Sequence, residues 1–170
     1  MSDYLNIASF LNPVNLQEIA GDDLYKKDQM GYVMSLYEEE FPDLEKTDIV
    51  FMGCGEQRGK GVMGPPSTAP NVIRKHFYSL FFWHEGIRLA DIGDIRQGAT
   101  YNDTLVALKT VIAELLAIGK TVIILGGSHD LTSAQYGAYV QNKKIIEATV
   151  VDTLIDLDME SPFDNDNFLM

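Results

Sequence analysis

Short apolar runs recur along the chain from residue 47 onward, and each ends at a glycine or beside an acidic residue. Runs of this length that are rich in Val, Ile and Leu predict buried β-strands. The predicted strands cover residues 48–53, 87–93, 121–125 and 146–154.

Between these runs the apolar residues recur every three or four positions, which predicts helices. The clearest helix covers residues 105–118, where the apolar residues fall on one face and Gly119 provides a stop. Residues 71–83, which follow Pro70, and residues 130–140 are also predicted to be helical.

Strands and helices therefore alternate over most of the chain. Nearly continuous apolar strands in such an arrangement are typical of a parallel sheet covered by helices on both faces. We expect an α/β fold with three layers, α/β/α, over residues 47–170, preceded by an irregular segment with short helices over residues 1–46. A chain of 170 residues has the length of a single domain with a sizeable core.

The charge of the chain limits its partners. The formal net charge is -12 and the isoelectric point is about 4.5, so neither nucleic acid nor an anionic membrane surface is expected as a partner. A single cysteine, Cys54, excludes an internal disulfide. No apolar run approaches the roughly 18 residues of a membrane span, and the first residues do not resemble a signal peptide. We therefore expect a cytoplasmic protein.

His129 follows the predicted strand at residues 121–125. Gly126 and Gly127 allow the backbone to turn tightly between this strand and the next helix. The imidazole then lies at the carboxyl end of a buried strand, where open α/β sheets bind their ligands. Neutral imidazole is a good ligand for divalent metals. The alternative is a histidine that only packs or caps in the turn.

Two carboxylates, Asp152 and Asp156, lie at the end of the last predicted strand. They share parity with Leu154, so all three side chains leave the same face of an extended segment. Two carboxylates on one face repel each other unless a cation or donor lies between them, and their hard oxygens suit Mg or Mn. His129, Asp152 and Asp156 therefore form a candidate metal site. The alternative is a pair of solvated acids at the start of an acidic tail.

Other candidate residues have less specific signals. The segment 53–61 contains several glycines but matches neither the dinucleotide fingerprint nor the Walker pattern, so we expect a flexible loop that faces a substrate. Cys54 has no evident partner base and is expected to be a small buried residue. Arg74 is expected to form a salt bridge that packs or caps its helix. The aromatic residues between 77 and 83 predict a core or a subunit interface.

Four motifs, in order, resemble those of the ureohydrolase family, which includes arginase, agmatinase and formimidoylglutamase. The family carries a Gly-Gly-Asp-His-Ser-like strand end and an Asp-Ala-His-x-Asp motif on a later strand. The corresponding segments here are Gly126-Gly-Ser-His129-Asp and Asp152-Thr-Leu-Ile-Asp156. Upstream, the segment 64–74 is similar to the family's Gly-Pro-x-x-x-Arg, and 90–93 is similar to its Asp-x-Gly strand end. Formimidoylglutamases resemble this chain most.

The resemblance implies a two-manganese site, in which a bridging hydroxide attacks the carbon of a linear amidine or guanidine. Within it, His129, Asp152 and Asp156 match the ligands of one ion. Three departures stand out. Leu154 replaces a histidine ligand of the second ion, Ser128 replaces the aspartate before the metal histidine, and the family's Ser-x-Asp-x-Asp motif has no counterpart. We therefore expect the chain to resemble the first half of the arginase fold with an incomplete site.

Three functional hypotheses follow from these observations. The first is a formimidoylglutamase-like hydrolase that, as this chain, is incomplete or inactive. The second is a non-catalytic binding or assembly module that retains the fold. The third is a one-metal hydrolase in which Asp130 or Asp158 joins the three candidate ligands. In each case apolar surface left uncovered by the partial fold predicts a homo-oligomer.

Overall fold

The structure, a computed structural model, describes residues 5–21, 25–149 and 151. Helices, strands and 3-10 turns follow one another along these residues in this order: α1 (Leu5–Ala8), β1 (Leu11–Asn12), α2 (Leu16–Ala20), α3 (Met30–Val33), β2 (Ser35–Leu36), η1 (Leu44–Lys46), β3 (Ile49–Gly53), η2 (Arg58–Lys60), α4 (Ala69–Phe77), β4 (Leu89–Ile95), α5 (Tyr101–Ala117), β5 (Thr121–Leu125), η3 (His129–Leu131) and α6 (Thr132–Gln141).

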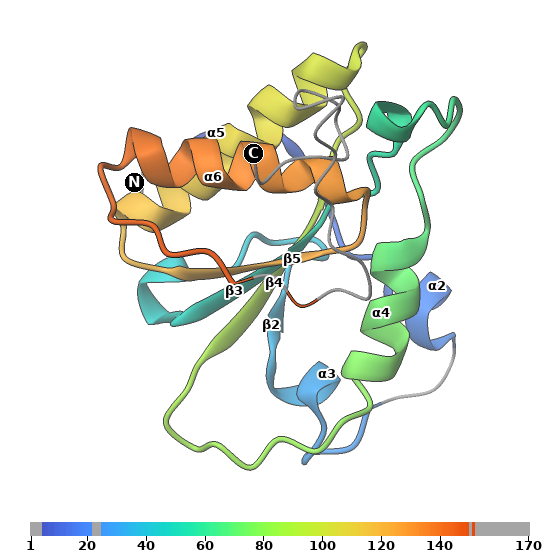
Figure 1. Cartoon of the computed structure of the whole chain (residues 1–170). Helices are drawn as coiled ribbons and strands as arrows, with labels where there is room; N and C mark the ends of the chain where they lie inside the picture. The colour runs from blue at the N-terminus through green and yellow to red at the C-terminus, as the bar shows by residue number, and fades with distance from the viewer. Residues whose placement is uncertain (1–4, 22–24, 150, 152–170) are drawn as a thin grey trace.

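One mixed, mostly parallel sheet forms the middle of the molecule (Figure 1). Its strand order is β1-β4-β3-β5, and β2 pairs with β4 as well. The β2–β4, β3–β4 and β3–β5 pairs are parallel, whereas the β1–β4 pair is antiparallel. Val50 in β3 lies opposite Ala90 in β4 and Val122 in β5. The carboxyl ends of β3, β4 and β5 therefore meet at one edge.

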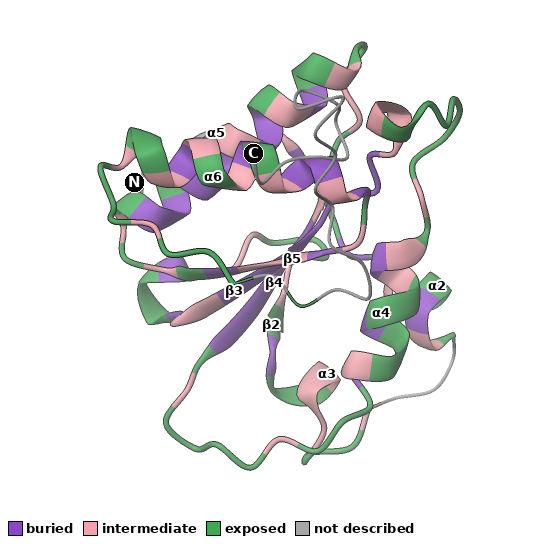
Figure 2. Ribbon diagram, in the orientation of Figure 1, coloured by how far each residue is buried: buried purple, intermediate pink, exposed green. Residues whose placement is uncertain are grey.

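Apolar side chains pack on both faces of this sheet, which confirms the expected three layers. Val50 and Met52 pack with α5 and α6, whereas Phe51 packs with α2 and α4. This alternation follows the two-residue period of a strand. The helices turn their buried sides toward the sheet and their exposed sides toward solvent (Figure 2).

The N-terminal residues before β3, expected to be short helices and loop, also contribute to the sheet. β1 pairs Leu11 with Ile95, and β2 pairs Leu36 with Asp91. Strands of two residues have no detectable alternation in sequence, so the sequence pattern could not reveal them. No helix in the described part of the chain has the length and apolar character needed to cross a membrane.

Two predicted helices have different bounds in the structure. The helix expected to continue to Trp83 ends at Phe77, because the backbone beyond it bonds to residues 28–31 instead. The Met30 and Gly31 amides donate to the carbonyls of Leu80 and Tyr78. The helix expected to begin at residue 105 begins at Tyr101. A capping box between Thr100 and Asp103 starts it one turn earlier.

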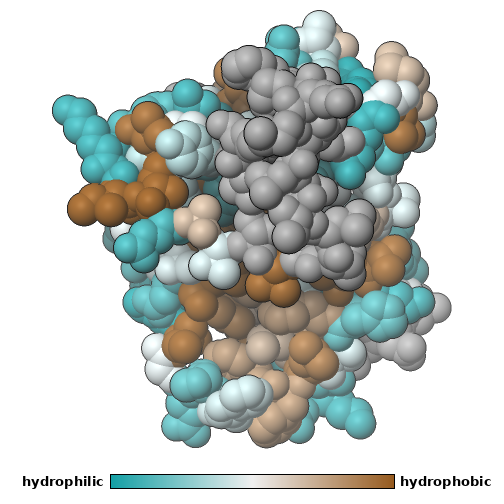
Figure 3. Space-filling model, viewed as in Figure 1, coloured by the Kyte–Doolittle hydropathy of each residue, from teal (hydrophilic) through white to brown (hydrophobic). Residues whose placement is uncertain are grey.

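The strand predicted at residues 146–154 is not formed in its described part. Residues 146–149 and 151 have no strand assignment, and the remainder lies outside the described residues. Within the described chain β5 therefore pairs on one side only, with β3. The segment that follows α6 runs back along this helix (Figure 1). Ile145 is 97% exposed there, and apolar side chains lie in the open over the C-terminal end of α6 (Figure 3).

Candidate metal centre

The turn after β5 brings His129 to the carboxyl edge of the sheet. Gly126 and Gly127 have φ values of 74° and 85°, a region that favours glycine. A Cβ on Gly126 would overlap the ring of Pro70, and one on Gly127 would overlap Leu131. The expectation of a tight glycine turn is therefore confirmed, and any side chain at either position would displace the turn that carries the histidine.

His129 opens the short η3 turn directly before α6. The Thr132 hydroxyl donates to the His129 carbonyl at 2.7 Å, and the Ser133 hydroxyl donates to the Asp130 carbonyl at 2.7 Å. These bonds satisfy carbonyls at the junction of η3 and α6, and they hold the backbone of the turn against the helix. The His129 side chain is half-buried.

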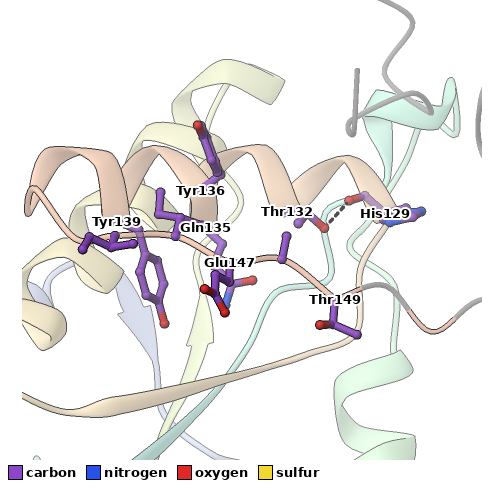
Figure 4. A pocket seen from close by; sticks show the side chains of 10 residues that line it. His129, Thr132, Gln135, Tyr136, Tyr139, Glu147 and Thr149 are labelled. Carbon is purple, nitrogen blue, oxygen red and sulfur yellow. Dashed lines mark hydrogen bonds between the residues drawn. The ribbon is translucent and has the colours of Figure 1, made fainter.

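A pocket of about 310 Å³ lies between α6 and the segment 145–149, with His129 at one end (Figure 4). Its polar lining comes from both walls, including Gln135 and Tyr139 of α6 and Glu147 opposite. His129 and Glu147 are the lining side chains with metal-binding chemistry. Among the described residues, no group of three or more His, Cys, Asp and Glu side chains could hold a metal ion.

The two candidate aspartate ligands, Asp152 and Asp156, lie outside the described residues, as does Leu154. Their convergence with His129 therefore stays a prediction. The described segment that leads to them, residues 145–149, does line the same pocket as His129.

Asp130, the residue after the histidine, faces a different environment. It is buried, and its Oδ2 accepts a hydrogen bond from the Tyr101 hydroxyl at the start of α5. Its Oδ1 is also buried and has no hydrogen-bond partner within the described chain. The absence of a side chain at Gly59 makes room for this carboxylate, because a Cβ there would overlap Oδ2. Burial and the Asp130 hydrogen bond both raise the pKa of Tyr101.

The glycine-rich segment after β3 is anchored by an ion pair. Arg58 Nη2 lies 2.6 Å from Glu56 Oε2, and the same guanidinium donates to the carbonyls of Gly98, Ala99 and Thr100 before α5. Burial alone would raise the pKa of Glu56, but hydrogen bonds from Arg58 and the backbone lower it to about 2. The segment expected to be flexible is therefore tied to the loop that begins α5.

Cys54 is fully buried at the end of β3, as expected for a small core residue. Burial raises the pKa of its thiol to about 12, so the reactive thiolate is disfavoured.

Arg74 forms a buried polar network between α4 and β4. The salt bridge expected for this residue is confirmed. It is a packing contact, because the guanidinium is completely buried beside Asp91 of β4, with Nε and Nη2 each 2.9 Å from a carboxylate oxygen. Nη1 also lies 2.6 Å from Asp94 Oδ1, and Tyr78 donates to Asp91. Burial, followed by the charge of Asp91, raises the pKa of Tyr78. The network joins α4 to β4.

The fold agrees with the comparisons to known proteins. The Arginase family matches residues 47–164, and the chain belongs to this family. No curated protein matches the chain.

Solved structures with the same fold include two formiminoglutamases. The enzyme from Trypanosoma cruzi, crystallised with Mn²⁺, is 21% identical with a TM-score of 0.53; the match covers 66% of this chain and 40% of that one. The formimidoylglutamase from Bacillus subtilis is 17% identical with a TM-score of 0.58, and the match covers 84% of this chain and 45% of that one. The chain thus spans less than half the length of these proteins.

Proposed function

We propose that this chain is a formimidoylglutamase-like member of the Arginase family whose own metal site is incomplete. The observation that carries the proposal is the position of His129. It lies on a glycine turn at the carboxyl end of a parallel strand, at one end of a pocket shared with residues 145–149. Ligands of open α/β sheets bind at this edge.

His129, Asp152 and Asp156 would hold one divalent ion, which we propose to be Mn²⁺. A histidine nitrogen and two carboxylates form a suitable donor set for this ion. Leu154 has no atom that can coordinate a metal, so a second ion would lack the ligand that the family has at this position. When bound, such an ion lowers the pKa of a coordinated water.

The reaction we propose for the family member is hydrolysis of a linear amidine such as formimidoylglutamate. The protein's residues would contribute by holding the ion and by shaping the pocket beside α6. Because Leu154 removes a ligand, we expect negligible amidine hydrolysis by this chain alone. The buried single cysteine accords with the cytoplasm as its location.

Manganese binding tests the proposal. Titration of the full chain with Mn²⁺, followed by electron paramagnetic resonance of the free ion, should give at most one bound ion per chain. The H129A variant should weaken binding at least tenfold, whereas H76A, which changes an exposed histidine on α4, should not. Two tightly bound ions in the wild type, or equal binding by H129A and the wild type, would contradict the proposal.

A second candidate function is a non-catalytic binding or assembly module, favoured by Leu154 and by the exposed apolar residues that follow α6, such as Ile145. In this case the chain would bind no manganese and would form homo-oligomers. The L154H variant separates the two functions. An increase in bound Mn²⁺ relative to the wild type supports a degraded catalytic site; no metal binding by either protein, together with a stable oligomer in light scattering, supports the module.

A further inference from the structure

A second pocket lies at the same edge of the sheet, beyond the carboxyl ends of β3 and β4. Its volume is about 180 Å³. Polar residues from three separate segments contribute to its lining: Asn12 of β1, Ser67, Thr68 and Asn71 at the start of α4, and Asp94 and Gln97 at and just after the end of β4. The pocket does not include His129 or any other residue of the candidate metal centre.

Asp94 supplies the charge of this pocket. Its Oδ1 lies 2.6 Å from Arg74 Nη1, while its Oδ2 has no hydrogen-bond partner among the described residues. The side chain is 29% exposed, so the carboxylate is neither sealed in the core nor open to bulk solvent. Gly53 allows this placement, since a Cβ there would overlap Asp94 Oδ1. The position of the carboxylate is therefore defined by both an ion pair and a close backbone approach.

The ion pairs of Asp91 and Asp94 leave a net negative charge. Among the described residues, Arg74 is the one cation that forms an ion pair with either carboxylate, so these three side chains together carry a formal charge of -1. Burial raises the pKa of Asp94 in spite of Arg74, and the nearby carboxylate of Glu18 raises it further. A cation placed at the free Oδ2 would compensate this charge where water is partly excluded.

Two neutral acceptors line the same pocket as this carboxylate. Gln97 donates through Nε2 to the Gly64 carbonyl at 3.3 Å, which leaves its Oε1 to accept. The Asn12 Oδ1 accepts from Arg96 and retains a second lone pair. One charged and two neutral acceptors match the three N–H donors of an ammonium group.

We propose that this pocket binds the primary ammonium group of a small amine. The volume lies below the roughly 300 Å³ at which pockets for drug-sized ligands begin, so the ligand is an ammonium head with a short carbon chain. The site is independent of manganese and of the proposed function. For so few atoms the dissociation constant is expected on the order of 1 mM.

Nuclear magnetic resonance of the ¹⁵N-labelled full chain tests this site. Titration with ethylammonium chloride should give saturable shifts of the Gly55, Thr68, Asn71 and Gln97 amides. Tetramethylammonium has the same charge but no N–H donors, and 1-propanol is neutral; neither should saturate these shifts. No saturation with ethylammonium up to about 50 mM, at the affinity expected, or equal shifts with tetramethylammonium, would overturn the proposal.

Two variants connect the shifts to the pocket. D94N should weaken ethylammonium binding at least tenfold. D43N changes an exposed acid that does not line the pocket, so it should bind ethylammonium as the wild type does. Because D94N also alters the contact with Arg74 and can fail to fold, Q97K provides a second test. It places a tethered ammonium at the pocket and leaves Arg74, Asp91 and Asp94 intact. Q97K should abolish ethylammonium binding and raise the melting temperature; unchanged binding in Q97K would overturn the proposal.

Discussion

Arg74 and Asp91 form a bidentate ion pair in which neither side chain is exposed to solvent. The guanidinium Nε and Nη2 each donate over 2.9 Å to a different carboxylate oxygen. The Tyr78 hydroxyl and the Gly93 amide donate to the same carboxylate, so each of its oxygens accepts two hydrogen bonds. Such a pair connects α4 to β4 with a fixed orientation, which a less directional contact could not provide.

Removal of one partner of this pair should destabilise the protein strongly. R74M leaves the Asp91 charge buried without its cation, and we expect the free energy of unfolding to fall by about 3–5 kcal/mol. Urea denaturation measures the change. R88M is a matched control, because its pair with Asp48 is exposed and its loss should be small. Similar losses in both variants would show that the buried pair contributes no more than the exposed one.

The Tyr101 hydroxyl should stabilise the turn that carries His129. Y101F removes the donor to Asp130 Oδ2 and leaves both oxygens of a buried carboxylate without partners among the described residues. We expect a loss of about 1–3 kcal/mol in the free energy of unfolding. Y37F is a suitable comparison, since Tyr37 also packs against the core and has no described hydroxyl bond. If Y101F and Y37F lower the free energy of unfolding by the same amount, the Tyr101–Asp130 hydrogen bond does not stabilise the fold as expected.

Glu56 should make stability depend on acid pH. Its pKa is about 2 in the folded protein and near 4.5 when unperturbed. Because the folded pKa is the lower one, the stabilisation is fully present above pH 4.5 and is lost as the pH falls toward 2. The difference in unfolding free energy between the wild type and E56Q should therefore be largest near neutral pH and shrink over this range. E114Q changes an exposed acid and should follow the wild-type curve. A constant difference for E56Q across the range would refute the assignment.

Cys54 should be unreactive in the native protein. Its thiol is buried, and its pKa of about 12 leaves very little thiolate at pH 8. A disulfide reagent such as Ellman's should modify the native chain slowly and the urea-unfolded chain rapidly. The unfolded chain should show one modified thiol per molecule, since the sequence contains a single cysteine. Rapid modification without urea would mean that the end of β3 opens easily.

Much of the fold could be predicted because its signals are local. The apolar run at residues 121–125 has the same bounds in the structure as in the prediction, and the two glycines after it adopt the positive φ values that the turn requires. Helix α5 was predicted from its apolar face, and only its first turn was missed. These features depend on neighbouring residues, whose spacing the sequence contains directly.

The polar networks could not be predicted in the same way. Arg74 and Asp91 are separated by 17 positions, and Arg58 reaches carbonyls about 40 residues away. A single sequence shows that these residues are charged but not which of them meet inside the fold. Of the candidate metal residues, His129 has its predicted place at the strand end, while Asp152 and Asp156 lie outside the described part of the chain.

The sequence by itself determined the order and type of the main strands and helices from β3 to α6 and the histidine at the end of β5, because helix and strand periods and glycine turns act over a few residues. Only the tertiary structure decided that β1 and β2 join the sheet, that α4 ends where residues 28–31 bond to its continuation, and that Arg74 is buried against Asp91. The sequence shows that an apolar side chain favours burial and that a buried charged side chain needs a partner. Its partner is chosen by how distant segments pack together.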